Sequence, residues 1–191
     1  MGRALCAALV ALALAGSPAL AQQPRHGLWI GFGLGGGGLT RWSDQDARST
    51  AGTLTGSLQG GVVLAPWLRV GLEANGWLLS ASDLNDPTKG ATVNELLAIA
   101  RAYPWPSRGL FLKAGYGWAS YGTNAAAGLG SSSFGAWLAG AGYELPVARN
   151  VSLTFAADWT RSPLGSVTDG VYSATGRRLQ GWDLIVGAQY H

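Results

Sequence analysis

The chain has 191 residues and a formal net charge of +3, and its basic residues form no patch, so nucleic acid is not an expected partner. Charged residues make up only 12% of the chain, against about 25% in soluble proteins, and 30 residues are glycine. No apolar run beyond the first residues approaches the roughly 20 residues of a spanning helix. This composition argues against a helical membrane protein and points to a transmembrane β-barrel.

The first 21 residues have the pattern of a secretory signal peptide. A basic start at Arg3 precedes an apolar run over residues 4–15, and Ala19-Leu20-Ala21 supplies small residues at a cleavage site. We expect cleavage after Ala21, with residues 22–191 forming one barrel domain. The only cysteine, Cys6, lies in the signal, so no disulfide and no cysteine metal site are expected in the mature chain.

The first predicted strand covers residues 28–35. Leu28, Ile30, Phe32 and Leu34 alternate with Trp29 and three glycines, and a period of two is the signature of a strand. Small residues on the inner face of a narrow barrel leave room for long side chains from opposite strands. The polar residues 40–51 that follow are interpreted as a loop.

Residues 53–64 and 68–79 form a predicted hairpin around the turn Ala65-Pro66-Trp67. Leucine, valine and glycine alternate with polar residues in both arms, and Arg69 and Glu73 share the polar face of the second arm. Each arm is longer than the usual soluble strand of about 5–6 residues. The length suits a tilted strand that crosses a bilayer, which needs about 9–11 residues.

Residues 80–90 are a second polar loop, and residues 92–103 are the next strand. We expect Glu95 and Arg101 on the inner face and Leu96, Ala98 and Ala100 on the outer face, although a short helix is an alternative for this apolar stretch. The prolines and glycine of residues 104–109 predict a turn.

Four more strands are predicted at residues 110–121, 134–145, 151–159 and 179–190, separated by loops at 122–132 and 161–178 and a short turn at 146–150. The connections alternate between long polar loops and short turns, as in bacterial outer-membrane barrels with long outer loops and short periplasmic turns. The predicted fold is therefore all-β, an eight-stranded antiparallel up-and-down transmembrane β-barrel.

The distribution of charge decides which face points inward. A soluble lipocalin-like barrel would need its many aromatic residues inside, where a small barrel has little room. In a membrane barrel the apolar face meets lipid, several aromatics fall near strand ends as interfacial girdles, and the charges line the lumen. Buried charges are costly unless paired, so we expect a polar network inside the lumen, formed by Arg69, Glu73, Glu95, Arg101, Lys113, Glu144, Asp158 and Asp183.

Three stretches resemble the small outer-membrane β-barrel family of OmpA-type, OmpX-type and opacity-type proteins: residues 101–104, residues 109–117, and residues 140–146 with 149–153. The resemblance covers the mature chain and implies a monomeric barrel in the outer membrane of a Gram-negative cell. It also implies contact with outer-membrane lipid and lipopolysaccharide, and insertion by the barrel-assembly machinery. Members end in an aromatic residue, whereas this chain ends Tyr190-His191. No periplasmic peptidoglycan-binding domain is expected.

Motifs for other chemistry are weak. Residues 31–36 match G-x-G-x-x-G, but no helix pattern follows, so no dinucleotide cofactor is expected. His26 and His191 are expected to be solvated near the chain ends, with no metal between them. Some eight-stranded outer-membrane barrels modify lipid A with a His, a Ser and an acid. Here Asp158 or Asp183 would have to act alone as the base, so we expect no enzyme.

Three functions remain, in decreasing order of expectation. The first is a structural and surface-interaction role through four long outer loops, because loops carry specificity on a fixed scaffold. The second is a narrow passive pore, and the third is a lipid A-modifying enzyme. The ligand of the loops is not identified, but candidate contact residues in the first and fourth loops are Arg41, Trp42, Arg48, Arg161, Asp169 and Tyr172.

Overall fold

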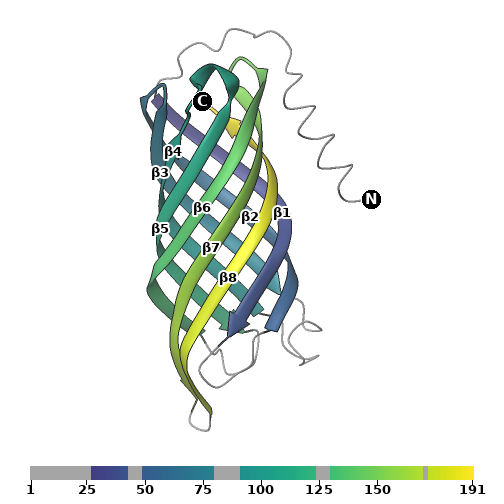
Figure 1. Ribbon diagram of the computed structural model, residues 1–191, viewed down its shortest axis with the longest axis vertical. Coiled ribbons are helices and arrows are strands. Elements are labelled where there is room, and N and C mark those ends of the chain that lie inside the picture. The colour runs from purple at the N-terminus through teal and green to yellow at the C-terminus, as the bar shows by residue number, and fades with distance from the viewer. Residues whose placement is uncertain (1–26, 43–48, 80–90, 124–129, 170–171) are drawn as a thin grey trace.

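A computed structural model of the protein describes residues 27–42, 49–79, 91–123, 130–169 and 172–191. Antiparallel strands form a closed barrel in the order β1 to β8, which confirms the predicted fold (Figure 1). The elements are β1 (Gly27–Trp42), β2 (Ser49–Ala65), β3 (Leu68–Leu79), β4 (Ala91–Ala102), the 3-10 helix η2 (Pro106–Arg108), β5 (Leu110–Thr123), β6 (Gly130–Ala148), β7 (Val151–Asp169) and β8 (Tyr172–Tyr190). Within the described residues, no helix is long and apolar enough to cross a bilayer.

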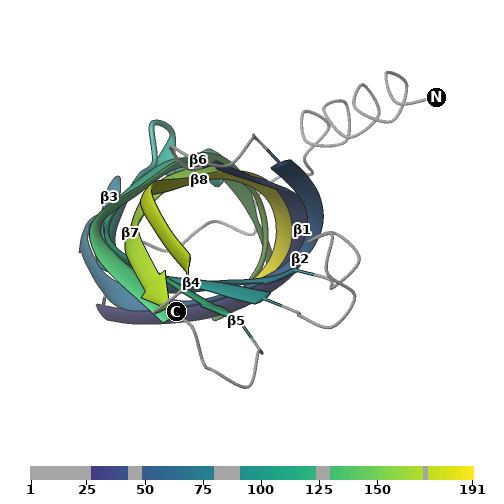
Figure 2. The ribbon, with the colours of Figure 1, turned by 90° about the horizontal axis from the view of Figure 1, so that it is seen from below.

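The barrel closes through pairing of β1 with β8, where Ile30 lies opposite Tyr190 and Trp42 opposite Arg178. Every strand therefore has a neighbour on both sides, as the end-on view shows (Figure 2). Closure satisfies the backbone N–H and C=O groups without water, which a chain in lipid requires. The first strand begins and the last strand ends at the same end of the barrel, the upper end in Figure 1.

Alternate residues face opposite sides of the barrel wall. Along β1, Leu28, Phe32 and Leu34 are 76%, 62% and 67% exposed, whereas Trp29 is 3% exposed. The predicted facing of β4 is also confirmed, because Glu95 and Arg101 are buried while Leu96 is exposed. Leucines outside and charges inside are the arrangement of a membrane barrel, the reverse of a soluble one.

The predicted loops at 40–51, 122–132 and 161–178 were too long. β1 continues to Trp42 and β2 starts at Ser49, β6 starts at Gly130, and only residues 170–171 lie between β7 and β8. The polar residues in these ranges were interpreted as loops. The strands nevertheless continue beyond the apolar, lipid-facing band, because each strand still has a neighbour with which its backbone can pair. The hydroxyls of Thr40 and Thr50 even hydrogen-bond across β1 and β2 at 2.9 Å.

The predicted turn over residues 104–109 is confirmed as a tight connection containing η2. Gly109 ends it with φ 72°, and a Cβ there would strike the backbone of Glu144. Only glycine meets both requirements without strain. The Gly109 carbonyl then accepts a 2.9 Å hydrogen bond from the Glu144 N–H, which fixes Glu144 at this end of the lumen.

Inside the barrel the side chains are sorted along its length. The end near the long connections holds a cluster of buried apolar residues, Leu39, Ala51, Trp77, Leu79, Val93, Tyr121 and Leu179. The middle and the opposite end hold the buried charges. We call these the apolar end and the charged end of the lumen. Eight strands leave an interior that side chains just fill, which agrees with this packing.

Candidate functional site

The charged end of the lumen is organised around the carboxylate of Glu144. Arg69 donates to Glu144 at 2.9 Å, and the Arg101 guanidinium lies 3.5 Å from it. The Tyr103 hydroxyl donates to the same carboxylate. Arg69 and Arg101 lie directly opposite each other on β3 and β4, and like charges in that position are destabilising. Glu144, from β6 across the lumen, compensates both.

Aromatic rings and amides complete this end. The Arg69 guanidinium lies 4.3 Å from the Tyr103 ring centre, and Arg101 lies 4.7 Å from that of Phe111, both within cation–π range. Arg101 also donates to the Gln189 side chain at 2.7 Å and to Gln59. Burial raises the pKa of the Tyr103 hydroxyl, with a smaller contribution from the neighbouring Glu144 charge. The hydroxyl therefore remains a donor at ordinary pH.

Lys113 is the centre of a second group in the middle of the lumen. Its Nζ donates to Glu73 at 2.8 Å and to Asp158 at 2.6 Å. Gly140 of β6 lies between Lys113 and Asp158 in the register. A Cβ on Gly140 would collide with Asp158 Oδ1, so the absence of a side chain there makes room for the ion pair.

Two of the expected lumen acids have no cationic partner among the described residues. Glu95 is 3% exposed and accepts hydrogen bonds from Thr160, at 2.8 Å, and from Ser162. Asp183 is 3% exposed and lies opposite Asp158 in the ladder of β7 and β8. In the part of the chain that the structure describes, neither Asp158 Oδ1 nor Asp183 Oδ1 has a hydrogen-bond partner.

All eight lumen residues expected from the sequence are buried inside the barrel. Six of them form ion pairs, namely Arg69, Glu73, Arg101, Lys113, Glu144 and Asp158. The described lumen holds five carboxylates and three cationic side chains. It therefore carries more negative than positive formal charge. Within the described residues, no group of three or more His, Cys, Asp or Glu side chains could hold a metal ion.

The expectation that His191 is solvated is wrong. Its side chain is 7% exposed and lies in the charged end, with Nε2 3.9 Å from Glu144 and 3.5 Å from Ser152 Oγ. A nucleophilic triad needs the acid on one ring nitrogen and the serine on the other. Here both approach Nε2, and Ser152 is fully buried, so the arrangement lacks the geometry of a hydrolase.

The proposed loop contacts are not gathered in loops. Arg41 and Trp42 belong to β1, and Arg161 is an exposed residue of β7 opposite Trp137 and Gln180. Arg48 lies outside the described residues. Asp169 and Tyr172 pair with each other at the ends of β7 and β8, and their side chains are outside the described part.

Sequence reasoning missed several contributors to the lumen. Gln59, Tyr103, Thr160, Ser162 and Gln189 all bind a charged side chain there. For Gln59 and Gln189 the signal was the inward position in the period-two pattern of their predicted strands. Thr160 and Ser162 lay beyond the predicted strand 151–159, and they extend its inward positions only because β7 continues to Asp169. Tyr103 shared the inward parity of Glu95 and Arg101 in the predicted strand 92–103, although the observed β4 ends one residue earlier, at Ala102.

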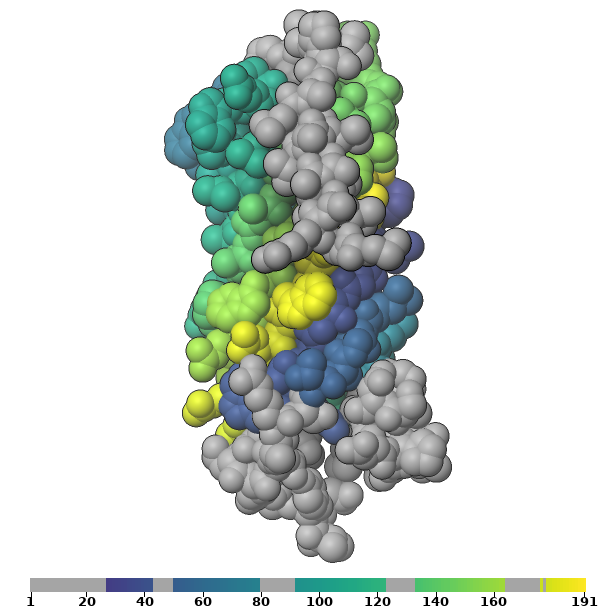
Figure 3. All heavy atoms as spheres, turned by 45° about the vertical axis from the view of Figure 1, so that its right-hand side comes forward, coloured from purple at the N-terminus to yellow at the C-terminus, as the bar shows by residue number. Residues whose placement is uncertain are grey.

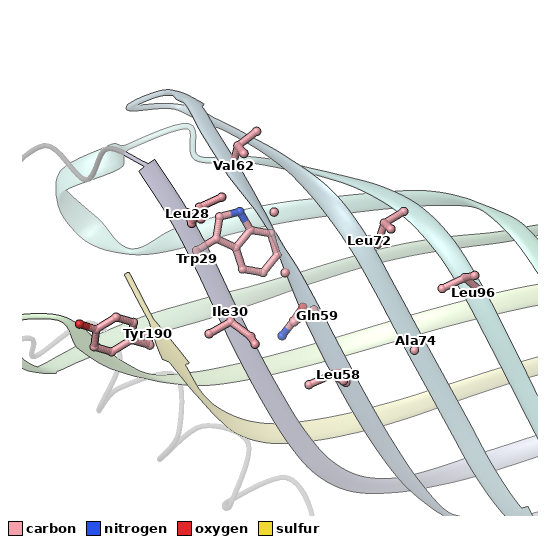
Figure 4. A pocket seen from close by; sticks show the side chains of 12 residues that line it. Leu28, Trp29, Ile30, Leu58, Gln59, Val62, Leu72, Ala74, Leu96 and Tyr190 are labelled. Carbon is pink, nitrogen blue, oxygen red and sulfur yellow. The ribbon is translucent and has the colours of Figure 1, made fainter.

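The outer wall has a hollow of about 650 Å³ over β1 to β4 (Figure 4). Its lining is almost wholly apolar, with Leu28 and Ile30 on one side, Leu72 and Leu96 on the other, and Gly60 between them. The hollow forms because Gly60 and Ala74 lack large side chains on this lipid-facing surface. It has no charged group.

The family model of the outer membrane protein beta-barrel domain matches residues 7–191. Among solved structures, Neisserial surface protein A is similar with a TM-score of 0.60 and 12% identity, covering 85% of this chain and 96% of that chain. Ail, the attachment invasion locus protein of Yersinia pestis, is similar with a TM-score of 0.51 and 10% identity, covering 87% of this chain and 100% of that one.

The solid-state NMR structure of outer membrane protein AlkL in lipid bilayers is similar with a TM-score of 0.52 and 12% identity, covering 92% of this chain and 94% of that one. No curated protein matches the sequence significantly. The closed barrel, the exposed apolar wall, the charged lumen and the match over nearly the whole chain lead to one conclusion: this protein belongs to the family of outer membrane β-barrel domain proteins.

Proposed function

We propose that the protein is an outer-membrane surface protein whose lumen is closed by its own side chains and whose extended outer end meets external partners. One observation carries this proposal. The lumen contains both a buried ion-pair network, centred on Glu144 and Lys113, and a buried apolar cluster around Trp77. A barrel filled in this way is an anchor rather than a wide channel.

The position of the long connections supports the same role. β7 and β8 run on past the apolar band to Asp169 and Tyr172, whereas the turns at the other end are short. In outer-membrane barrels the long side faces outward. We place the strand ends beyond Arg41 and Arg161 at the cell surface, in a monomer exported by a cleaved signal peptide and inserted by the barrel-assembly machinery.

A narrow cation leak is the alternative, and the charge imbalance of the lumen favours it. The described lumen holds five carboxylates and three cationic side chains. One oxygen of Asp158 and one of Asp183 have no hydrogen-bond partner among the described residues, and such oxygens would suit water or a small cation. A lipid A-modifying activity has less support, because Asp158 and Asp183 are buried inside the lumen and a lipid substrate lies outside the wall.

Single-channel recording of the refolded protein in planar bilayers tests closure. We expect no steady conductance beyond rare small events, whereas a steady large current would contradict the closed lumen. A sequence tag inserted within residues 80–90, and another at Ser107, tests orientation on intact cells. Antibody binding to the first tag alone is expected, and binding to the second alone would reverse the assignment of the ends.

A further inference from the structure

The described acidic side chains and the exposed basic side chains lie on different sides of the barrel wall. All five carboxylates whose side chains are described are buried in the lumen. The exposed charged residues of the described part are all arginines, namely Arg108, Arg149, Arg161 and Arg178. An outer surface with arginines and no described acid complements an anion.

Two of these arginines are neighbours on the outer wall near the extracellular end. Arg161 lies opposite Gln180, and Arg178 lies opposite Pro163 in the same β7–β8 ladder. They are therefore diagonal neighbours, with Cβ atoms about 7–8 Å apart. Both point outward, because the residues beside them, Thr160 and Leu179, are buried. Two like charges at this spacing repel each other unless an anion lies between them.

Tryptophans surround the arginines. Trp137 lies opposite Arg161, and Trp42 lies opposite Arg178. The next outward-facing pair of the β7–β8 ladder, on the side of the charged end of the lumen, is Trp159 opposite Trp182. The rings of Trp137 and Trp159 pack edge to face, with their centres 4.5 Å apart. Side chains of β7, β8 and β1 lie next to one another on this face (Figure 3). We call Arg161, Arg178 and Gln180 with these four tryptophans the outer arginine patch.

The level of the patch in the membrane follows from β8. Outward residues run Trp182, Leu184, Val186, Ala188 and Tyr190, a length of about 26 Å along the strand. At the usual tilt this covers most of an apolar band of about 25 Å, with aromatic girdles at its edges. Trp182 then marks the outer interface, where tryptophan prefers to lie. Arg178 and Arg161 lie beyond it, at the height of lipid headgroups.

We propose that the outer arginine patch binds the phosphate of a phosphorylated glycolipid of the outer leaflet. Arg161 and Arg178 bind the phosphate, since the guanidinium fork matches phosphate oxygens bidentately. Gln180, opposite Arg161 and two residues from Arg178 on β8, donates to sugar hydroxyls. The tryptophan rings pack against the sugar and the first part of the acyl chains. The inference rests on the outward orientation of this end in the proposed function, and it names the lipid partner that stays with the barrel.

The test is native mass spectrometry of the refolded protein with lipid A that carries both phosphates. The wild type is expected to retain lipid A, and the double variant Arg161→Ala/Arg178→Ala is expected to bind at least about tenfold more weakly. The matched control is Arg108→Ala/Arg149→Ala, which removes the two exposed arginines of the short turns and should leave retention unchanged.

A second comparison uses only the wild type and so does not depend on the variant folding. Dephosphorylated lipid A and phosphatidylglycerol should both be retained more weakly than phosphorylated lipid A. Equal retention of either, or full retention by Arg161→Ala/Arg178→Ala, would overturn the proposal. The tag experiment on intact cells keeps the two hypotheses apart. If the tags show the proposed orientation and the protein retains no lipid A, only this inference fails and the proposed function stands.

Discussion

The two ends of the lumen are closed by different physical means. The charged end is closed by Glu144 between two arginines, with Tyr103 and Gln189 completing the contacts. The apolar end is closed by packed side chains such as Trp77, Val93 and Leu179. Ion pairs define one arrangement because an unpaired charge is costly, whereas apolar packing tolerates substitution of similar volume. The barrel therefore combines a specific closure with an adaptable one.

The largest effect is expected from removing the central carboxylate. Glu144→Gln leaves Arg69 and Arg101 facing each other without compensation, and breaking a buried pair costs about 3–5 kcal/mol. Urea unfolding of the barrel in lipid vesicles measures the loss. Arg108→Ala, on an exposed turn, is the control. A loss below about 1 kcal/mol would mean that water already compensates the two arginines.

The apolar packing can be tested on two neighbouring leucines of β4. Leu97 is fully buried in the lumen, and Leu96 is 50% exposed on the lipid side. Leu97→Ala should cost about 2–5 kcal/mol because it leaves a cavity. Leu96→Ala should cost less, since lipid chains fill the vacated space. Equal losses in vesicle unfolding would contradict the assigned facing of β4.

A glycine substitution tests the middle ion pair. Gly140→Ala places a methyl group against Asp158 Oδ1 and forces Lys113 and Asp158 apart, with an expected loss of about 1–3 kcal/mol. Gly52→Ala is the matched control, because a Cβ there meets nothing within 4 Å. The difference between the two in vesicle unfolding should vanish if the Lys113–Asp158 pair is absent in the bilayer.

The smallest effect is expected from Tyr103→Phe, which removes one of several donors to Glu144 and should cost about 0.5–1.5 kcal/mol. The pKa of the Tyr103 hydroxyl is raised on folding, so its contribution is fully present below the unfolded value of about 10. The contribution falls as pH rises beyond that value. Unfolding of both proteins at pH 7 and at pH 10.5 measures this, and a difference that grows with pH would contradict the raised pKa.

The period-two pattern was sufficient for the fold and for the eight charged residues of the lumen, but not for all of the polar residues that bind them. Each strand buries one face, so the parity of a position determines whether it points inward, and Arg69, Glu73 and Lys113 followed from parity alone. The sequence did not show which of these residues form ion pairs. Partners such as Lys113 and Asp158 lie on different strands, and they meet only once closure of the barrel fixes the register between the strands. The burial of His191 likewise depends on the closing register of β8.

The strand ends were less predictable for a related reason. Serine, threonine and glycine between residues 161 and 178 resemble a loop, yet β7 and β8 remain paired there. The composition of a segment indicates only its own secondary-structure preference. Whether the segment forms a strand also depends on a neighbouring strand that lies in register with it. The same limit concealed the outer arginine patch, since Arg161 and Arg178 become neighbours only in the ladder.

Labelling of a cysteine inside the lumen tests the closed barrel most directly. Thr55 of β2 is 3% exposed, and its side chain points into the lumen of the barrel. Ser107 is exposed on the short turn that contains η2. In the mature chain, expected to lack cysteine, Thr55→Cys should stay unmodified by a charged thiol reagent while the barrel is folded and react once it is unfolded in urea. Ser107→Cys should react in both states. Rapid modification of folded Thr55→Cys would mean that the lumen is an open aqueous path.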